Sequence, residues 1–430
     1  MQHRIPVEAL PPGGRLMARA VETCVHCGFC LPSCPTYRVL GEEMDSPRGR
    51  IVLMKQALEG ELSARDVLPY VDRCLGCLGC ETSCPSGVHY RDLLIPFRAK
   101  AEIEARSGSG RWRARLFLGL LESPRLFRVA VMGGQLARHA SGLVPPALRP
   151  MLRLLPGSLA PMRPLPALVP AQGVRRARVA LLSGCVQQVL APDINHATLR
   201  VLAANGIEAI VPAEPGCCGA LAAHAGHAEH ARARAVRLLR GFPADVDAIV
   251  TNAAGCGSAM KDYGMLFEGT PLEEEAKRFA ARVRDVSEIL DGEGLTAPLR
   301  LTTPMTVAYH DACHLSHAQH VRAAPRRLLG AVENLTVREV PDGEICCGSA
   351  GLYNLEQPEI AEKLGAAKAA AVASTHAEAV VAGNVGCLVQ LAAHLESSGR
   401  RMPVMHTIEL LARALPRATG GGVNFNFCND

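Results

Sequence analysis

Short apolar runs alternate with longer segments rich in alanine and leucine through the C-terminal half of the chain. Four runs have the length and composition of buried strands: 178–182, 246–251, 305–309 and 377–383. The segments 228–242 and 359–374 carry apolar residues along helical faces. Because strands that alternate with helices assemble into parallel sheets, this half is expected to form α/β modules with parallel strands.

The hydrophobic pattern of the N-terminal part indicates a helix between two cysteine-rich segments. Asp45 or Ser46 is a suitable N-cap, and Pro47 suits the first helical turn. Gly60 ends the segment. The apolar face of this helix is expected to contain Ile51, Leu53, Met54 and Leu58. The longest apolar stretches of the chain, such as residues 116–121, are far shorter than the roughly 20 residues that a membrane-spanning helix needs.

Seventeen cysteines occur in the 430 residues, and eight of them form two N-terminal runs, "CVHCGFCLPSCP" and "CLGCLGCETSCP". Both runs have the spacing C-x2-C-x2-C-x3-C-P, which is typical of bacterial ferredoxins that carry two clusters. Three cysteines at three-residue steps surround one cubic cluster, and the fourth ligates the neighbouring cluster. Structural zinc prefers pairs of C-x2-C, so iron–sulfur clusters are favoured over zinc. The predicted ligands of the first 4Fe–4S cluster are Cys24, Cys27, Cys30 and Cys84, and those of the second are Cys74, Cys77, Cys80 and Cys34.

Eight further cysteines belong to three signatures that each occur twice in the C-terminal half. The first copy contains Cys185, Cys217, Cys218 and Cys256, and the second contains Cys313, Cys346, Cys347 and Cys387. Equivalent cysteines are 128, 129 and 131 residues apart, which indicates a duplicated module of about 120 residues. Adjacent cysteines point in different directions, so a Cys-Cys-Gly (CCG) turn can contact two metal atoms of one centre. Buried structural cysteine is the alternative, and we take these eight residues as candidate metal ligands at strand ends.

Charge and composition exclude several functional classes. A net charge of +5, the absence of any run of lysines and a single Trp argue against nucleic-acid binding. The N-terminus lacks the apolar core of a signal peptide, so we expect an intracellular protein whose thiols serve metal or redox chemistry rather than disulfides. No G-x-G-x-x-G follows a predicted strand, so the dinucleotide-binding fingerprint is not found.

These observations predict an α+β multidomain chain, in which a helical ferredoxin domain with two 4Fe–4S clusters precedes two duplicated α/β cysteine-rich modules. The expected limits are 1–104 for the ferredoxin-like domain, 105–175 for a basic helical linker rich in Pro and Leu, 176–297 for the first CCG module, 298–416 for the second CCG module, and 417–430 for a flexible tail. We interpret the linker as a segment that docks on a partner or packs within the protein, with contact to a membrane surface as the alternative. Cys428, in the tail, is not expected to be a ligand.

Charged and imidazole side chains lie close to the predicted centres in the sequence. Arg48 and Arg50 are placed to offset the negative charge of a thiolate-ligated cluster, unless they are solvated surface arginines. His26 is expected to tune the first cluster rather than bind it. A histidine can replace a cysteine at a metal or move a proton, but such residues lie more often on helix surfaces or at caps. Six further histidines are left out of the ligand set for this reason: His224, His227, His230, His310, His314 and His317.

The motifs resemble those of iron–sulfur proteins that join a two-cluster ferredoxin to two CCG modules. The segments "CVHCGFCLPSCPTYRVLGEEMDSPRGRIVLMKQ" and "CETSCPSGVHY" are similar to those of glycolate oxidase (glycolate dehydrogenase) iron–sulfur subunits. The same holds for "EPGCCGALAAH" with "AGCGSAMKDYG", and for "CCGSAGLYNL" followed by "GNVGC". The wider group includes a heterodisulfide reductase subunit, the anaerobic glycerol-3-phosphate dehydrogenase C subunit and lactate-utilisation proteins.

The resemblance implies the iron–sulfur electron-transfer subunit of a flavin-dependent oxidoreductase complex. Partner FAD-binding subunits would oxidise glycolate to glyoxylate, and two 4Fe–4S clusters in this chain would pass the electrons toward a quinone or another respiratory acceptor. The expected location is cytoplasmic, with peripheral contact at the inner face of the cytoplasmic membrane. The alternatives are the same role in a related lactate, glycerol-3-phosphate or other 2-hydroxyacid dehydrogenase, and a heterodisulfide-reductase-like thiol–disulfide enzyme.

The chain departs from the heterodisulfide reductase form at one position in each module. That form ends each module in C-x2-C and so supplies five thiols, whereas Ala253 and Asn384 stand here three residues before Cys256 and Cys387. Each module therefore has four cysteines. A further iron–sulfur cluster held by four thiolates, zinc, or no metal all stay open for the CCG modules.

Overall fold

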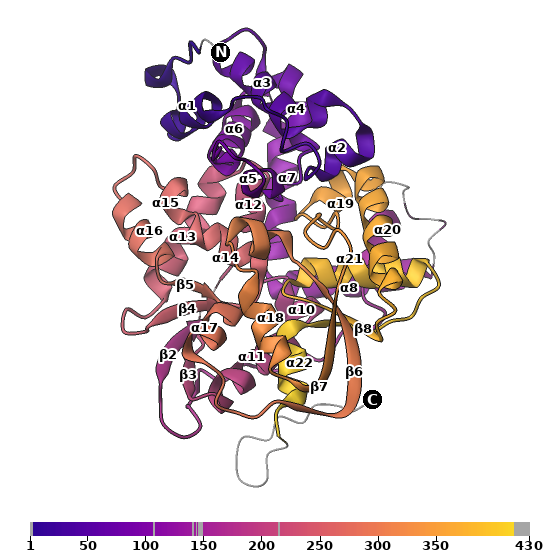
Figure 1. Cartoon of the computed structure of the whole chain (residues 1–430). Helices are drawn as coiled ribbons and strands as arrows, with labels where there is room; N and C mark the ends of the chain where they lie inside the picture. The colour runs from indigo at the N-terminus through magenta and orange to yellow at the C-terminus, as the bar shows by residue number, and fades with distance from the viewer. Residues whose placement is uncertain are drawn as a thin grey trace.

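The computed structural model describes residues 3–105, 108–139, 142, 144, 149–213 and 216–416. A helical N-terminal part lies at the top of the view in Figure 1, above two modules that each contain a small sheet. This arrangement confirms the predicted fold class. The predicted tail at 417–430, with Cys428, lies outside the described residues.

The described N-terminal part contains six α-helices: α1 (Gly14–Thr23), α2 (Pro35–Leu40), α3 (Pro47–Leu58), α4 (Ala64–Asp72), α5 (Gly79–Thr82) and α6 (Tyr90–Ala105). Helix α3 is the helix that the sequence predicts, and the Ser46 hydroxyl oxygen caps it by accepting a hydrogen bond from the Gly49 N–H (3.0 Å). The other helices gain their stability from a shared apolar core. This core contains Met17, Met54, Val67, Val71 and Leu93.

The described residues of the predicted linker contain three α-helices: α7 (Gly108–Glu122), α8 (Pro124–Arg138) and α9 (Arg149–Leu154). Leu118 of α7 packs against Ala222 and Ala231 of the first module. At the end of the same helix, the buried Glu122 carboxylate pairs with the Arg234 guanidinium at 2.7 Å. The linker helices therefore cover the CCG modules. The limits of the five predicted segments stay a prediction.

Each module contains a sheet of parallel strands in the same order. The first sheet has the order β1-β3-β2-β4-β5, with β1 (Leu168–Val169), β2 (Ala177–Leu181), β3 (Ile207–Ile210), β4 (Ala248–Thr251) and β5 (Val283–Asp285). The second has the order β7-β6-β8-β9, with β6 (Arg300–His310), β7 (Glu333–Glu339), β8 (Ala379–Ala382) and β9 (Val404–His406). Only β1, from the linker, pairs antiparallel among the described strands.

The register shows that the two sheets are copies of one another. Val179 of β2 is paired with Ala248 of β4, and Val307 of β6 is paired with Ala379 of β8. These four residues are equivalent by the offsets that separate the cysteines. The structure thus confirms both the internal repeat and the parallel strands that the sequence predicts.

Helices cover both sheets and join the modules into one body (Figure 1). Those of the first module are α10 (Gln187–Leu190), α11 (Asp193–Ala204), α12 (Ala220–His224), α13 (Ala228–Gly241), α14 (Ala254–Lys261), α15 (Tyr263–Leu266), α16 (Glu273–Ala280) and α17 (Val286–Glu293). Those of the second are a π-helical turn (His314–Ala318), α18 (Ala323–Gly330), α19 (Tyr353–Glu356), α20 (Pro358–Ser374), α21 (Val385–Ser397) and α22 (Thr407–Ala414). Leu181 and Tyr309, from the central strands of the two sheets, belong to the same apolar core.

Polar contacts fasten the N-terminal part to both modules. The Arg91 guanidinium pairs with Asp262 of the first module at 3.0 Å and donates to the Ala318 carbonyl of the second at 3.0 Å. The Tyr353 hydroxyl donates to the Arg73 carbonyl at 2.8 Å, one residue before the second cysteine run. The cysteine loops are therefore held against the modules that carry the other cysteines.

Candidate metal centres

The two N-terminal cysteine runs meet around one small cavity. Its lining includes Cys24, Cys27, Cys30, Cys80 and Cys84. Four of these five residues are the predicted ligands of the first cluster, and none of the sixteen described cysteines forms a disulfide. Gly28 has a left-handed backbone (φ +88°), and a β-carbon there would lie 2.8 Å from Nη1 of Arg48. The loop therefore needs glycine at this position.

The predicted ligands of the second cluster also lie near one another. Burial raises the pKa of the Cys80 thiol, and the neighbouring Cys77, Cys74 and Cys34 raise it further. Burial likewise raises the pKa of Cys30 to about 11. A metal that binds these residues as thiolates must therefore displace their protons. The assignment of each cysteine to a cluster stays a prediction.

The two arginines that the sequence singles out have different surroundings. Arg50 is fully buried, and its guanidinium donates to the Thr36 hydroxyl (3.0 Å) and to the Asp45 carboxylate (3.0 Å). Its Nη1 atom lies 3.9 Å from the Cys34 sulfur. Arg48 is partly exposed and pairs with Glu43 at 2.6 Å. Arg50 thus has the position expected of a charge that compensates cluster thiolates.

In the first module the four cysteines gather at the carboxyl ends of β2, β3 and β4. Cys185 follows β2, Cys217 and Cys218 follow β3, and Cys256 lies in the first turn of α14. The sulfurs of Cys185 and Cys217 are 3.7 Å apart. Hydrogen bonds with Cys217 and Cys256, together with burial, raise the pKa of Cys218. The loops of this sheet edge therefore bring together all four candidate ligands.

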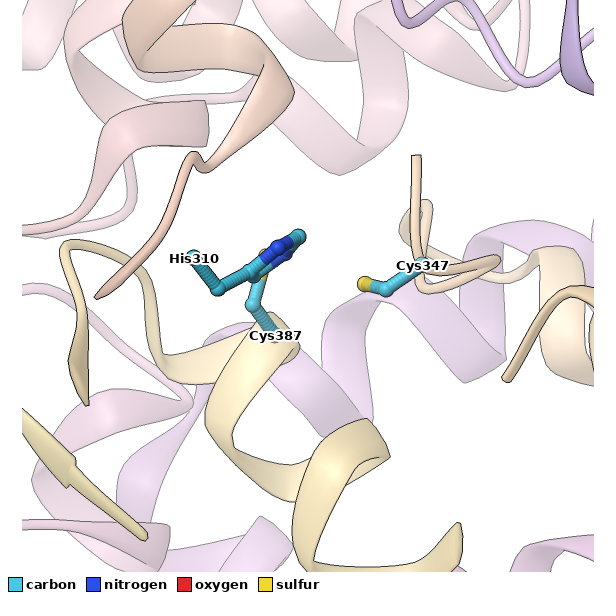
Figure 2. Close-up of side chains that lie close together, drawn as sticks. All are labelled: His310, Cys347 and Cys387. Atoms are coloured by element: carbon cyan, nitrogen blue, oxygen red, sulfur yellow. The ribbon is translucent and has the colours of Figure 1, made fainter. Parts of the chain in front are cut away.

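The second module repeats this arrangement and adds a histidine. The sulfurs of Cys313 and Cys346 are 3.8 Å apart. Figure 2 shows the other two cysteines beside His310: ligand atoms of His310, Cys347 and Cys387 all lie within 4.8 Å of one another. All five residues are buried. The sequence places the four cysteines in the candidate set but leaves His310 outside it.

The glycine that follows each Cys-Cys pair is required by the backbone. Gly219 and Gly348 have φ angles of +79° and +89°. A β-carbon would lie 3.0 Å from the Ala231 carbonyl oxygen at Gly219, and 2.9 Å from the Ala361 carbonyl oxygen at Gly348. Each turn thus packs directly on the backbone of a later helix of its module, α13 in the first and α20 in the second, as the predicted close approach requires.

Most of the other histidines near the cysteines have partners within the protein. The His230 ring pairs with Glu122 at 2.8 Å, and the His317 ring hydrogen-bonds to the Thr82 hydroxyl at 2.7 Å. The rings of His224 and His314 meet edge to face, with centroids 5.1 Å apart. Burial lowers the pKa of His224 to about 3, so this ring is neutral at physiological pH.

A cavity of about 310 Å³ lies between the linker helices, the N-terminal part and the modules. All four cysteines of the first module line it, as does Cys74 of the N-terminal part. Its apolar wall includes Phe117 of α7, Phe127 of α8 and Met151 of α9. The sequence gives no sign of this cavity, because its walls come from segments far apart in the chain. Within the described residues, no helix is both long and apolar enough to cross a membrane.

Two family models match the chain. A model described as a 4Fe–4S dicluster domain matches residues 20–88. A model described as a cysteine-rich domain, CCG, matches twice, at residues 179–261 and 307–392. The first match contains the eight cysteines of the N-terminal runs, and each of the other two contains one set of four.

Relatives match nearly the whole chain. It is 36% identical to the probable glycolate oxidase iron-sulfur subunit of Bacillus subtilis (strain 168), over 92% of this chain and 94% of the relative. It is also 36% identical to the glycolate oxidase iron-sulfur subunit of Escherichia coli (strain K12), over 94% of this chain and 98% of the relative. Lactate utilization protein A of Oceanobacillus iheyensis is 30% identical but matches only 54% of this chain.

Proposed function

This chain belongs to the family of glycolate oxidase iron–sulfur subunits, and on that premise we propose that it carries electrons within a glycolate oxidase complex. The observation that carries the proposal is the tandem ferredoxin spacing of eight free thiols in a chain that matches these relatives along its length. A role in lactate utilization is less well supported for this chain, because the lactate utilization relative matches only about half of it. Oxidation of glycolate to glyoxylate would take place on partner subunits that hold FAD.

In this proposal the chain supplies the ligands and the surroundings of two clusters. The ligands are Cys24, Cys27, Cys30 and Cys84 for one and Cys74, Cys77, Cys80 and Cys34 for the other. When bound, each 4Fe–4S cluster supplies a one-electron carrier. The Gly76 N–H lies 3.4 Å from the Cys74 sulfur, and the Val88 N–H lies 3.5 Å from the Cys84 sulfur. Such donors offset the charge of the thiolates and help to set the reduction potential.

The test is the substitution Cys24→Ser in the full complex. Loss of one cluster should lower iron and sulfide by about four atoms each per chain and reduce electron flow from glycolate to the acceptor at least about tenfold. Reduction of the partner flavin by glycolate should persist. Cys428→Ser, outside both motifs, is the matched control and should leave metal content and electron flow unchanged. Unimpaired electron flow in Cys24→Ser would show that this chain does not connect glycolate oxidation to the acceptor.

The electron acceptor that we propose is a membrane quinone, bound in the cavity of about 310 Å³. Pockets of this size with mostly apolar walls suit a small lipophilic ligand. The four cysteines of the first module line the same cavity, so a ligand there would lie next to that centre. Two of the helices that form its apolar wall, α7 and α8, also carry the exposed apolar residues described next.

One face of α8 and part of α7 expose a row of large apolar side chains to solvent. The row contains Trp112, Leu116, Leu126, Val129, Met132 and Leu136. Arg115 and Arg125 are exposed beside it. A helix surface with exposed Trp and Leu and adjacent arginines is typical of contact with an anionic membrane. We therefore propose membrane contact through this face, although the sequence alone favours docking or packing.

Two measurements test the acceptor and the membrane face. The full chain should sediment with vesicles that contain anionic lipids, and the double variant Leu126→Glu/Val129→Glu should not. Val174→Glu, at a valine that is more exposed and lies outside these helices, is the control.

A photoreactive quinone should label peptides of α7 to α9, and unlabelled quinone should compete with it. Labelling elsewhere would overturn the cavity assignment, and failure of the chain to bind vesicles would assign the apolar face to a partner subunit.

A further inference from the structure

The second module holds a buried histidine where the first module has leucine. His310 lies three residues before Cys313, and Leu182 lies three residues before Cys185. Both side chains are almost fully buried, at 1% and 2% exposure. We propose that His310 binds metal together with Cys347 and Cys387. The centre of the second module would then be a mixed cysteine–histidine site, whereas that of the first would have cysteine ligands only.

Geometry supports His310 as a ligand. Figure 2 shows His310, from the end of β6, beside Cys387 of α21, with the Cys347 sulfur directed toward them from the loop after β7. The three ligand atoms lie within 4.8 Å of one another. Neither ring nitrogen of His310 has a hydrogen-bond partner of ordinary geometry among the described residues. Burial of an unpaired imidazole is unfavourable, and metal ligation would compensate for it.

A histidine of the same module shows the contrast. His394, on α21, is also buried, and its Nε2 hydrogen-bonds to the Gln390 amide at 3.2 Å. It does not belong to the group of ligand atoms around Cys347. Burial of a histidine in this module therefore does not by itself place the ring at the cysteines.

The donor set favours a centre with more than one metal atom. Two thiolates on one tetrahedral ion, with metal–sulfur bonds of about 2.3 Å, stand about 3.8 Å apart. Cys313 and Cys346 have this separation, and they form a pair next to the group of Cys347, Cys387 and His310. A single tetrahedral ion takes four ligands, whereas five donors are present here. Thiolate and imidazole together suit iron or zinc.

The experiment compares three variants of the full chain, purified without oxygen. Iron, zinc and acid-labile sulfide are measured per chain, and retention of each metal is followed during competition with a chelator. His310→Leu installs the residue that the first module has at this position. Cys387→Ser removes a cysteine that the sequence already identifies as a candidate ligand. His394→Leu is the matched control. We expect His310→Leu to lose the same metal as Cys387→Ser, with affinity reduced at least tenfold, and His394→Leu to retain it.

A spectroscopic measurement on the unmodified sequence makes the result independent of folding in the variants. Protein labelled with ¹⁵N-histidine should show nitrogen coupling to a paramagnetic iron centre beyond the signals of the ferredoxin clusters, or a nitrogen scatterer at the zinc absorption edge. His310→Cys should restore the metal without the nitrogen signal. Absence of a nitrogen ligand in the unmodified protein, or unchanged metal retention in His310→Leu, would overturn the proposal.

Discussion

In the first module all four cysteines line the cavity between the linker helices and the modules, whereas Cys313 and Cys346 of the second module lie against the N-terminal part. Cys313 and Cys346 pack in one apolar cluster with Leu75 and Cys77 of the second cysteine run. The same duplicated sheet thus presents one centre to an open cavity and buries the other beside a predicted cluster. A duplication of this kind allows two copies of one site to take different positions in a single protein.

The comparison also separates what the scaffold determines from what the neighbouring residues determine. The register of the sheets and the left-handed glycines are the same in both modules, and they fix where the cysteines lie. The residues beside the sulfurs differ: Leu182 corresponds to His310, and Ala253 corresponds to Asn384. The second module also buries the ammonium of Lys368, which donates to the Gly343 carbonyl at 3.3 Å. These differences predict two centres with different metal affinities.

The largest effect on stability is expected at the left-handed glycine that the two CCG turns share. Gly219→Ala and Gly348→Ala each force alanine into a left-handed backbone and bring its β-carbon to about van der Waals overlap with a helix carbonyl. Each substitution should lower the free energy of unfolding by about 2–4 kcal/mol. Gly292→Ala in α17 has open space around it and should change this value by less than about 1 kcal/mol. Denaturant titration measures all three, and a tolerated alanine in only one module would show that the two CCG turns are not equivalent.

A smaller effect concerns the contact between the modules. The buried His406 ring lies next to the backbone of Asn252 and Gly383, which occupy equivalent positions after β4 and β8. Burial lowers the pKa of His406 to about 4, although these backbone contacts raise it. The unfolded chain binds this proton near pH 6.5, so stability is lost as the pH falls from about 6.5 toward 4.

The measurement is the difference in unfolding free energy between pH 7 and pH 5. The His406 contribution to this difference should be about 2 kcal/mol, and His406→Asn should remove it while keeping a side chain that can cap α22. The exposed His139 supplies the control His139→Asn, which should keep the pH dependence. An unchanged pH dependence in His406→Asn would place the acid-sensitive group elsewhere.

Much of this comparison could be predicted from the sequence, because it depends on local patterns. The strand at 305–309 lies within β6, the helix at 359–374 lies within α20, and Ser46 caps α3 as expected. Cysteine spacing identified all sixteen candidate ligands, since chelating loops have characteristic spacings. Which thiols share a metal is a matter of three-dimensional distance, and it stays a prediction.

The parts that sequence reasoning missed depend on contacts between distant segments. Strand β1 has only two residues and gains its partner from β3, so no periodic pattern marks it. The cavity is formed by linker helices that fold over loops of both modules, and these segments lie far apart in the sequence. His310 could be noticed next to Cys313, but only the fold shows that its ring lies beside Cys347 and Cys387.

The open cavity of the first module predicts a difference in thiol reactivity after metal removal. Cys256 is partly exposed and lines the cavity, whereas Cys387, its counterpart, is 2% exposed. Iodoacetamide should therefore modify Cys256 at least about tenfold faster than Cys387, because alkylation requires an accessible thiolate. Mass spectrometry of time points gives both rates from one sample. Equal rates in a folded, metal-free protein would mean that the cavity does not distinguish the two modules.

The smallest expected effect tests the residue that stands three positions before the last cysteine. The Asn384 amide donates to the Cys387 sulfur at 3.5 Å, and the first module has Ala253 at this position, which cannot donate. A hydrogen bond to a metal thiolate stabilises the ligand by about 1 kcal/mol, so Asn384→Ala should lower metal affinity in the second module about fivefold. Chelator competition measures this change, and the reciprocal variant Ala253→Asn should raise affinity in the first module if its amide reaches Cys256. Because the cysteine scaffold is the same in both modules, opposite shifts in the two variants would attribute the difference to this neighbouring side chain. A shift in neither variant would leave His310 as the main distinction between the two centres.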